Sequence, residues 1–242
     1  MKKLSTLVTL LAFGVLFYAA RDLPRIGDPS SPASSHLSPR FIEQAEHETG
    51  APNMVTAILA DYRGFDTLGE TVVIFTAGLA CLLVLGAFQR RYEPTPVDKS
   101  LLEGFGSDVL EAASRLMIPF ILLFAAYVLV HGHDSPGGGF QAGAILAAAI
   151  ILVKLVRGPT NWTIPLGWTM GIASVGVMVY AGIGVACMLA GGTFLDYGVL
   201  PLASDTAHAR AMATLGIETG VFIAVTAVLV MIFDSLSLGR EG

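Results

Sequence analysis

A polar, glycine-rich run separates two apolar stretches in the second half of the chain. The run reads HGHDSPGGGFQ over residues 131–141, and the apolar stretches cover residues 116–130 and 142–156. In hydrocarbon, each unsatisfied backbone N–H or C=O group costs several kcal/mol, so such a break persists only where protein or water satisfies it. The sequence therefore predicts that other parts of the protein pack against this run.

The composition is typical of a membrane protein. Hydrophobic residues make up 54% of the 242 residues and charged residues only 14%, against roughly 45–50% and about 25% in soluble domains. A span needs roughly 20 apolar residues to cross about 30 Å of hydrocarbon. We therefore predict an all-α, polytopic protein with about six transmembrane helices, of which the third and fourth are short: residues 4–20, 67–88, 116–130, 140–156, 166–190 and 212–233.

A long polar loop that contains short helices is expected between the first two spans, over residues 21–66. Ser38 as N-cap and Pro39 at the first helical position predict a helix start, and Gly50 predicts its end. The first span has the charge pattern of a signal peptide, but a cut after Ala20 would place Tyr18 where a small residue is needed. We therefore favour a retained anchor.

The Lys and Arg residues predict the orientation in the cell inner (cytoplasmic) membrane, because these residues are retained on the cytoplasmic side. With both termini cytoplasmic, nine of the fourteen lie inside: Lys2, Lys3, Arg90, Arg91, Lys99, Arg115, Lys154, Arg157 and Arg240. The net charge is -5 without a basic cluster, so no nucleic-acid partner is expected. Cys81 and Cys187 form no CxxC pattern, so we expect no disulfide framework and no iron–sulfur or haem cofactor.

Three longer motifs resemble subunits of one transporter family. HGHDSPGGGFQAG and GIETGVFIAVTAVLVMIFDSLS are similar to the B subunit of Mrp-type (Mnh-type) multisubunit sodium/proton antiporters, a likeness that covers residues 93–242. ETGAPNMVTAILADYRGFDTLGETVV, residues 48–73, resembles both the C-terminal tail of the large A subunit in these antiporters and the small subunit of membrane-bound hydrogenases. The resemblance implies a two-span A-tail module over residues 1–92 and a B-like module of about four spans over residues 93–242, with the boundary near Pro94.

The resemblance also implies a function. It is that of a non-catalytic subunit of an Mrp-type cation/proton antiporter, with the other antiporter subunits and the lipid bilayer as partners and sodium ions or protons as the transported species. A redox-driven complex such as a membrane-bound hydrogenase is the alternative, because in stand-alone antiporters the A-tail usually belongs to the large A subunit. A purely structural scaffold is a third possibility.

Four charged residues gather just ahead of the second expected span: Asp61, Arg63, Asp66 and Glu70. Ionisable groups at this depth are candidates for an ion pathway because their burial is costly, and Arg63 is a plausible counter-ion. The alternative is helix capping, in which Thr67 caps the helix and Glu70 completes a capping box. Both interpretations remain open on the sequence.

His131 and Glu218 are two further ion-pathway candidates. His131 follows the third span, where it can bond the last helix carbonyls or relay protons while stacked on Tyr127. Glu218 lies near the start of the sixth span. His131 and His133 lack a third ligand nearby, so no metal site is expected, and Lys154 is expected to snorkel towards the interface.

The glycine-rich run is expected to be structural. Gly137, Gly138 and Gly139 lack the Lys-Ser/Thr pair of a phosphate-binding loop, and together with Pro136 and Phe140 they let the chain turn back into the membrane. Gly143 and Ala147 continue the small-residue face from Gly139 at intervals of four residues. Such a face lets helix backbones approach closely in lipid.

Overall fold

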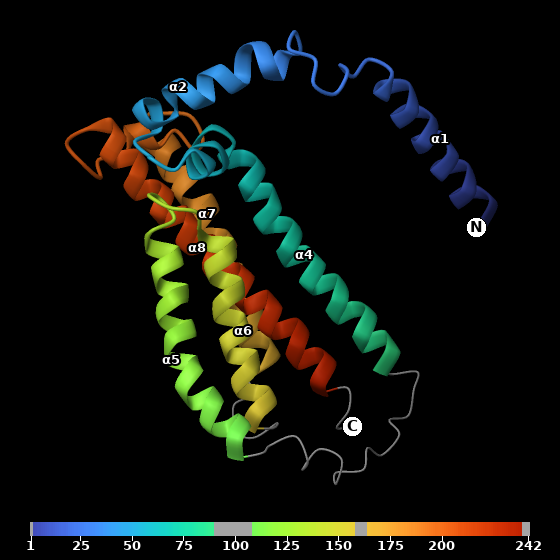
Figure 1. Ribbon diagram of the computed structural model, residues 1–242. Helices are drawn as coiled ribbons and strands as arrows, with labels where there is room; N and C mark the ends of the chain where they lie inside the picture. Colours follow the sequence, from blue (N-terminus) through green and yellow to red (C-terminus); the bar gives the residue numbers. More distant parts are fainter. Residues whose placement is uncertain (1, 90–107, 158–163, 239–242) are drawn as a thin grey trace. The chain divides into compact units, whose positions relative to one another are not determined.

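The computed structural model describes residues 2–89, 108–157 and 164–238. Within these ranges the regular structure is helical, as expected, and five helices are long and apolar enough to cross a membrane. They are α4 (Gly64–Gln89), α5 (Asp108–Val130), α6 (Gly139–Arg157), α7 (Leu166–Leu189) and α8 (Thr206–Leu238) (Figure 1). The first expected span corresponds to α1 (Lys2–Ala20), whose apolar part, Thr6–Ala20, is shorter than the other five. The expected module boundary near Pro94 lies outside the described residues.

Two spans begin earlier than their apolar cores predict. α5 starts at Asp108 rather than at residue 116, so the third span extends its short apolar core by flanking residues. Asp108 and Glu111 in its first turn are favoured by the positive end of the helix dipole. α8 starts at Thr206 rather than at residue 212, because the Asp205 carboxylate accepts the Ala207 N–H at 2.9 Å and stabilises the first turn.

Contacts along the chain divide it into two units, residues 1–44 and residues 45–242. The first unit contains α1, a π-helical turn η1 (Ala33–Leu37) and the first part of α2 (Ser38–Thr49). The helix at Ser38 begins as predicted, but Ser38 is not an N-cap: its backbone is already helical and its hydroxyl donates to the Ala33 carbonyl at 2.8 Å. α2 ends before Gly50, whose φ of 72° confirms the predicted stop.

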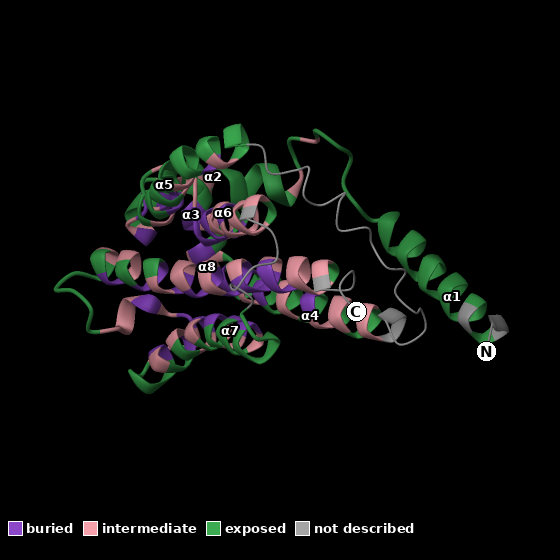
Figure 2. Cartoon of the chain, turned by 90° about the horizontal axis from the view of Figure 1, so that it is seen from below, coloured by how far each residue is buried: buried purple, intermediate pink, exposed green. Residues whose placement is uncertain are grey.

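In the second unit α8 is the central helix. It packs against α4, α6 and α7, and Figure 2 shows buried residues along much of its length. The largest fully buried side chains on α8 are Ile217, Val221, Val225, Val228 and Met231. Close approach rests on small residues, since a Cβ added at Gly176 of α7 would lie 2.6 Å from the Gly220 oxygen of α8. Backbone proximity, rather than large interlocking side chains, therefore sets the α7–α8 contact.

Candidate functional site

The chain enters the second unit's bundle through an irregular segment. α3 (Met54–Thr56) runs into a π-helical turn η2 (Ala57–Tyr62), which breaks at Arg63 before α4 begins. Side-chain hydroxyls satisfy three carbonyls of this break: Thr67 donates to Leu59 at 2.6 Å, Tyr197 to Ala60 at 3.0 Å and Tyr180 to Gly64 at 2.6 Å. Side chains of the protein thus supply the hydrogen bonds that lipid could not supply to these carbonyls.

One of the two tyrosines precedes the turn that follows α7 in the sequence, and the other follows it. Tyr180 lies on α7, and Tyr197 begins a short 3-10 turn, η5 (Tyr197–Val199), in the loop between α7 and α8. Both side chains are completely buried. Burial raises the pKa of Tyr197 above its ordinary value, so its phenol stays neutral and can donate to the Ala60 carbonyl.

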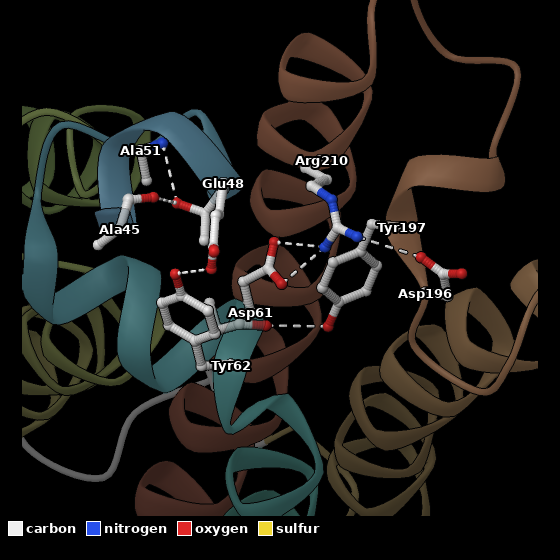
Figure 3. A network of polar contacts seen from close by, with 10 residues as sticks. Ala45, Glu48, Ala51, Asp61, Tyr62, Asp196, Tyr197 and Arg210 are labelled. Carbon is white, nitrogen blue, oxygen red and sulfur yellow. Dashed lines mark hydrogen bonds and ion pairs between the residues drawn. The ribbon is translucent and has the colours of Figure 1, made fainter. Parts of the chain in front are cut away.

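Asp61 lies at the centre of a charged network that joins the break to α8 (Figure 3). Arg210 Nη1 donates to both carboxylate oxygens of Asp61, at 2.8 and 3.0 Å, and Nη2 donates to Asp196 at 3.2 Å. The Asp61 side chain is only 10% exposed. Burial raises its pKa, although the charge and hydrogen bonds of Arg210 oppose the rise. The site therefore holds a buried carboxylate paired with a cation that it shares with Asp196.

Further hydrogen bonds in Figure 3 connect the end of α2 to the irregular segment. The Tyr62 hydroxyl donates to the Glu48 carboxylate, and the Thr49 hydroxyl donates to the Ala45 carbonyl at 2.8 Å while accepting the Ala51 N–H at 3.2 Å. The end of α2 is thereby tied to the turn that presents Asp61.

The other charged residues of the predicted cluster do not converge on Asp61. Arg63 pairs with Asp66, with Nη2 2.5 Å and Nε 2.6 Å from Oδ2, and both side chains are more than half exposed. Arg63 therefore serves as a counter-ion within the cluster, as predicted, but its partner is Asp66, and the cation of Asp61 is Arg210. The Glu70 side chain is exposed on α4 and makes no hydrogen bond or ion pair with another described residue.

The capping box expected at Thr67 is also not formed. α4 already begins at Gly64, which places Thr67 inside the first turn. Its hydroxyl donates to the Leu59 carbonyl instead of accepting a backbone N–H. Glu70 is thus free of the capping role that competes with the ion-pathway interpretation.

The glycine-rich run between α5 and α6 is held by the segment around α3. Asn53 Nδ2 donates to the carbonyls of Gly132 and Ser135 at 3.1 and 2.7 Å, and its backbone N–H donates to the His133 carbonyl at 3.1 Å. The Thr56 hydroxyl adds a bond of 2.5 Å to the Gly132 carbonyl. The prediction that other parts of the protein pack against this run is confirmed, and the packing partner is the segment that contains Asn53 and Thr56.

His131 follows the C-terminal end of α5 with both of its expected local contacts. Its ring stacks on Tyr127, with centroids 4.2 Å apart and planes at 21°, and Nδ1 lies 3.2 Å from the Tyr127 carbonyl. His133 Nδ1, in contrast, is buried without a hydrogen-bond partner among the described residues. No group of three or more His, Cys, Asp or Glu residues in the described ranges is arranged to hold a metal ion.

Glu218 contacts the N-terminal end of α6. A predicted ion-pathway residue and the predicted structural glycine run therefore lie together. A Glu218 carboxylate oxygen accepts the Gly139 N–H, and a Cβ added at Gly138 would lie 2.9 Å from the same oxygen. Gly138 also has φ 128°, a conformation open to glycine, and a Cβ at Gly139 would overlap the Glu218 backbone. Backbone N–H groups at a helix N-terminus are favourable partners for a carboxylate, so the start of α6 holds the Glu218 side chain in place.

The remaining loop and packing residues also contact the bundle. A Cβ at Gly137 would lie 2.8 Å from the Val128 oxygen, and one at Gly143 would lie 2.9 Å from the Phe222 oxygen of α8. Phe140 packs against the main core, whereas Pro136 is exposed. Glycine at 137 and 143 therefore allows close approach at both places.

Arg210 and Asp196 belong to the site but are missed by sequence reasoning. The apolar pattern places Arg210 in a loop, because it starts the last span at residue 212. Asp205, a favoured N-cap residue, is the signal that extends the helix to include Arg210.

Lys154 does not snorkel, so that expectation is wrong. Its Nζ lies 2.6 Å from both carboxylate oxygens of Asp234, across the α6–α8 contact, and the two side chains are 11% and 14% exposed.

Comparison with known proteins identifies two families along the chain. Residues 109–231 match MnhB, the family of domains related to the MnhB subunit of the Na⁺/H⁺ antiporter, and residues 29–102 match MbhE, the E subunit of MBH. A probable K⁺/H⁺ antiporter A/B subunit of Rhizobium meliloti is 30% identical over 85% of this chain. The chain spans only 22% of that relative's length.

Two solved structures share the fold. A chain of the Mrp complex from Dietzia sp. DQ12-45-1b is 32% identical, with a TM-score of 0.65, over 96% of this chain and 25% of its own length. A chain of the membrane-bound sulfane sulfur reductase, an archaeal respiratory membrane complex, is 30% identical with a TM-score of 0.64, and the match covers 98% of both chains. Residues 29–102 are similar to the E subunit of MBH, and this multi-pass membrane protein belongs to the family of domains related to the MnhB subunit of Na⁺/H⁺ antiporters.

Proposed function

We propose that this chain is a non-catalytic membrane subunit of an Mrp-type cation/proton antiporter module, and that the end of its bundle containing Asp61, Glu70 and Glu218 contributes to the path of a sodium ion or a proton. It works in the cell inner membrane with both termini cytoplasmic, and the other subunits of the module are its partners. The likeness to the Rhizobium antiporter protein and to the Dietzia Mrp complex supports this assignment.

The observation that carries the proposal is the position of Glu70. It is the seventh residue of α4, about 9 Å into the helix at 1.5 Å per residue, and its side chain is exposed within a candidate span. Its neighbour Val73 is 65% exposed, so this face of α4 is open in the isolated chain. A carboxylate at the centre of a bilayer costs about 2.5–3.5 kcal/mol on insertion scales, and such groups face protein or water rather than lipid. A neighbouring subunit that covers Glu70 would complete a hydrated or charged contact at this point.

The three carboxylates at this end of the bundle differ in how deeply they are buried. Asp61 is buried and held by Arg210, Glu218 is partly buried against the α6 N-terminus, and Glu70 faces outward. Each carboxylate lies on a different part of the bundle, and ionisable groups within or at the ends of spans are candidates to bind a cation or to accept a proton. The set therefore fits a pathway that passes from this chain to a neighbour.

The second candidate function is the same module inside a redox-driven ion-pumping complex. The archaeal sulfane sulfur reductase chain favours it, since the match covers 98% of each chain and includes the A-tail segment on the same short polypeptide. Purification of the intact complex distinguishes the two, because redox subunits would co-purify only in the second case. In either complex the proposed part played by the Glu70 face is the same.

Glu70→Gln tests the ion-path proposal. The variant keeps the side-chain size and removes the negative charge, and Glu111→Gln on α5 is the matched control because it makes the same change at an exposed carboxylate. The complete complex is reconstituted into vesicles, cation-driven proton movement is followed with a pH-sensitive dye, and assembly is checked on native gels. We expect transport to fall at least tenfold in assembled Glu70→Gln and to stay unchanged in Glu111→Gln. Normal transport by assembled Glu70→Gln would leave the chain a scaffold at this position.

A further inference from the structure

Two buried tyrosines converge on the point where α4 begins. Tyr180 comes from α7 and Tyr197 from η5, and both side chains are 0% exposed. Their hydroxyls donate to carbonyls on either side of the break, Tyr197 to Ala60 at 3.0 Å and Tyr180 to Gly64 at 2.6 Å. A Cβ added at Gly64 would lie 2.9 Å from the Tyr197 oxygen and 3.6 Å from the Tyr180 oxygen. Glycine at this position therefore leaves room for both hydroxyls.

The two hydrogen bonds bracket the residues where the helix changes its register. η2 is a π-helical turn, whose hydrogen bonds join residues i and i+5, and Arg63 leaves the helical conformation with φ -119° and ψ 28°. In a continuous α-helix, the competing arrangement, the Ala60 carbonyl would accept the Gly64 N–H. A shift of one residue would turn η2 by about 100° relative to α4, since an α-helix has about 3.6 residues per turn. The register therefore decides which way Asp61 points.

The loop that presents Tyr197 is held in a strained conformation. Among the described residues, Leu195 is the one non-glycine residue with a positive φ, 64°, and it is buried. Residues in this region persist only where the surrounding structure over-determines them. Here Leu195 allows the next two side chains to face different partners. Asp196 accepts Arg210 Nη2 at 3.2 Å, and Tyr197 reaches the break.

The tyrosine pair also lies among the carboxylates of the proposed path. Tyr180 is within electrostatic reach of Glu70 and Glu218, and Tyr197 is within reach of Asp61. Asp61 belongs to η2 and Glu70 to α4, on the two sides of the break. A change of register in the break would therefore move Asp61 relative to Glu70.

We propose that Tyr180 and Tyr197 are positioning residues of the ion path, whose hydroxyls hold the break in the register that directs Asp61 to Arg210. In this role neither phenol binds the ion or exchanges a proton. The inference rests on the proposed function and adds two residues that act on the path through Asp61. Loss of either hydroxyl should weaken cation binding more than it slows turnover, because one carboxylate is displaced while the rest of the path is unchanged.

The test removes each hydroxyl and keeps the ring that fills the core. Tyr180→Phe and Tyr197→Phe are compared with Tyr18→Phe, the matched control at a side chain that is 70% exposed on α1. Gly64→Ala keeps both phenols but places a methyl group 2.9 Å from the Tyr197 oxygen. Its control is Gly86→Ala on the same helix, where an added Cβ has no atom within 4 Å. All variants are made in the complete complex and checked by native gel.

Two measurements separate positioning from folding. Cation-driven proton movement in vesicles is measured over a series of cation concentrations, and the Asp61 carboxyl band, identified with Asp61→Asn, is titrated by infrared spectroscopy. We expect Tyr180→Phe, Tyr197→Phe and Gly64→Ala to assemble and to raise the half-saturating cation concentration at least fivefold, with the maximal rate reduced less than twofold. The pKa of Asp61 should rise in these variants, because Arg210 opposes the effect of burial only while the two groups are paired. Both controls should match wild type.

An unchanged half-saturating concentration and an unchanged Asp61 pKa in the assembled phenylalanine variants would overturn the proposal. A fall in maximal rate alone, with the Asp61 band unchanged, would do the same. Failure of all three variants to assemble would assign the hydroxyls a purely structural role and would also overturn it. If these variants behave as wild type while Glu70→Gln loses transport, this inference alone fails and the proposed function stands.

Discussion

The contact between α7 and α8 predicts the effect of a single added methyl group at Gly176. A Cβ at this position would lie 2.6 Å from the Ala224 nitrogen and 2.6 Å from the Gly220 oxygen, both backbone atoms of α8. These distances are about 0.8 Å short of the 3.4 Å at which ordinary contact begins. Backbone atoms inside a helix cannot rotate away, so Gly176→Ala must push the two helices apart.

Gly171→Ala on the same helix is the matched control. A Cβ there has no atom within 4 Å. Both variants gain the same helix propensity, about 1 kcal/mol for Ala over Gly, so this gain cancels when they are compared. The difference that remains is the cost of overpacking, typically about 1–3 kcal/mol. For a domain of this size, about 2 kcal/mol corresponds to a midpoint shift of roughly 4–8 °C.

The assay measures the loss of monodisperse protein after heating, by size-exclusion chromatography in detergent. We expect the midpoint of Gly176→Ala to lie several degrees below that of Gly171→Ala, which should equal or exceed wild type. Equal midpoints for the two alanine variants would show that α7 and α8 do not approach at Gly176, and the reasoning would fail.

Three further predictions concern the loop, the orientation and the charged network. Asn53→Ala removes its side-chain bonds to the run between α5 and α6, so we expect faster amide exchange over residues 131–138 by mass spectrometry, and unchanged exchange would refute it. With the native cysteines removed, Ser34→Cys should react with an impermeant thiol reagent on intact cells and Ser237→Cys should not; the reverse result would invert the topology. Burial raises the pKa of Asp61 against the opposing effect of Arg210, so the stability contribution of this carboxyl is full below its unfolded pKa and is lost as the pH rises through the folded pKa. Arg210→Gln should raise that pKa further in an infrared titration of the carboxyl band, and a lower value would contradict the assignment.

Much of the architecture is predictable because membrane insertion depends on local composition. Runs of about 20 apolar residues must form helices, since only internal hydrogen bonds satisfy the backbone in lipid. The five long helices and the end of α2 at Gly50 follow from this rule and from local capping signals. The starts of α5 and α8 are missed because their first turns are polar, and a hydropathy pattern does not register a helix that continues into water.

The candidate site is predictable only in part. Asp61, Glu70 and Glu218 are identifiable as costly charges near span ends, and the His131 contacts follow from spacing along one helix. The partners of the other groups cannot be derived in this way. Arg63 is nearest to Asp61 in sequence, yet the structure gives that place to Arg210, 149 positions away. Sequence proximity favours the wrong cation because the π-helical turn directs Asp61 towards α8.

The sequence by itself determined that the chain is helical, that it is built for a membrane, and that the polar run at residues 131–141 needs a partner. The tertiary structure decided which groups meet. Asp61 with Arg210, Gly139 with Glu218, and Lys154 with Asp234 are joined across 149, 79 and 80 positions. The reason is physical: hydrophobicity and capping act over a few turns, whereas the pairing of charges depends on which helix faces come together. Those faces are selected by close backbone contacts at small residues such as Gly176 and Gly220, which become neighbours only when the whole bundle is packed.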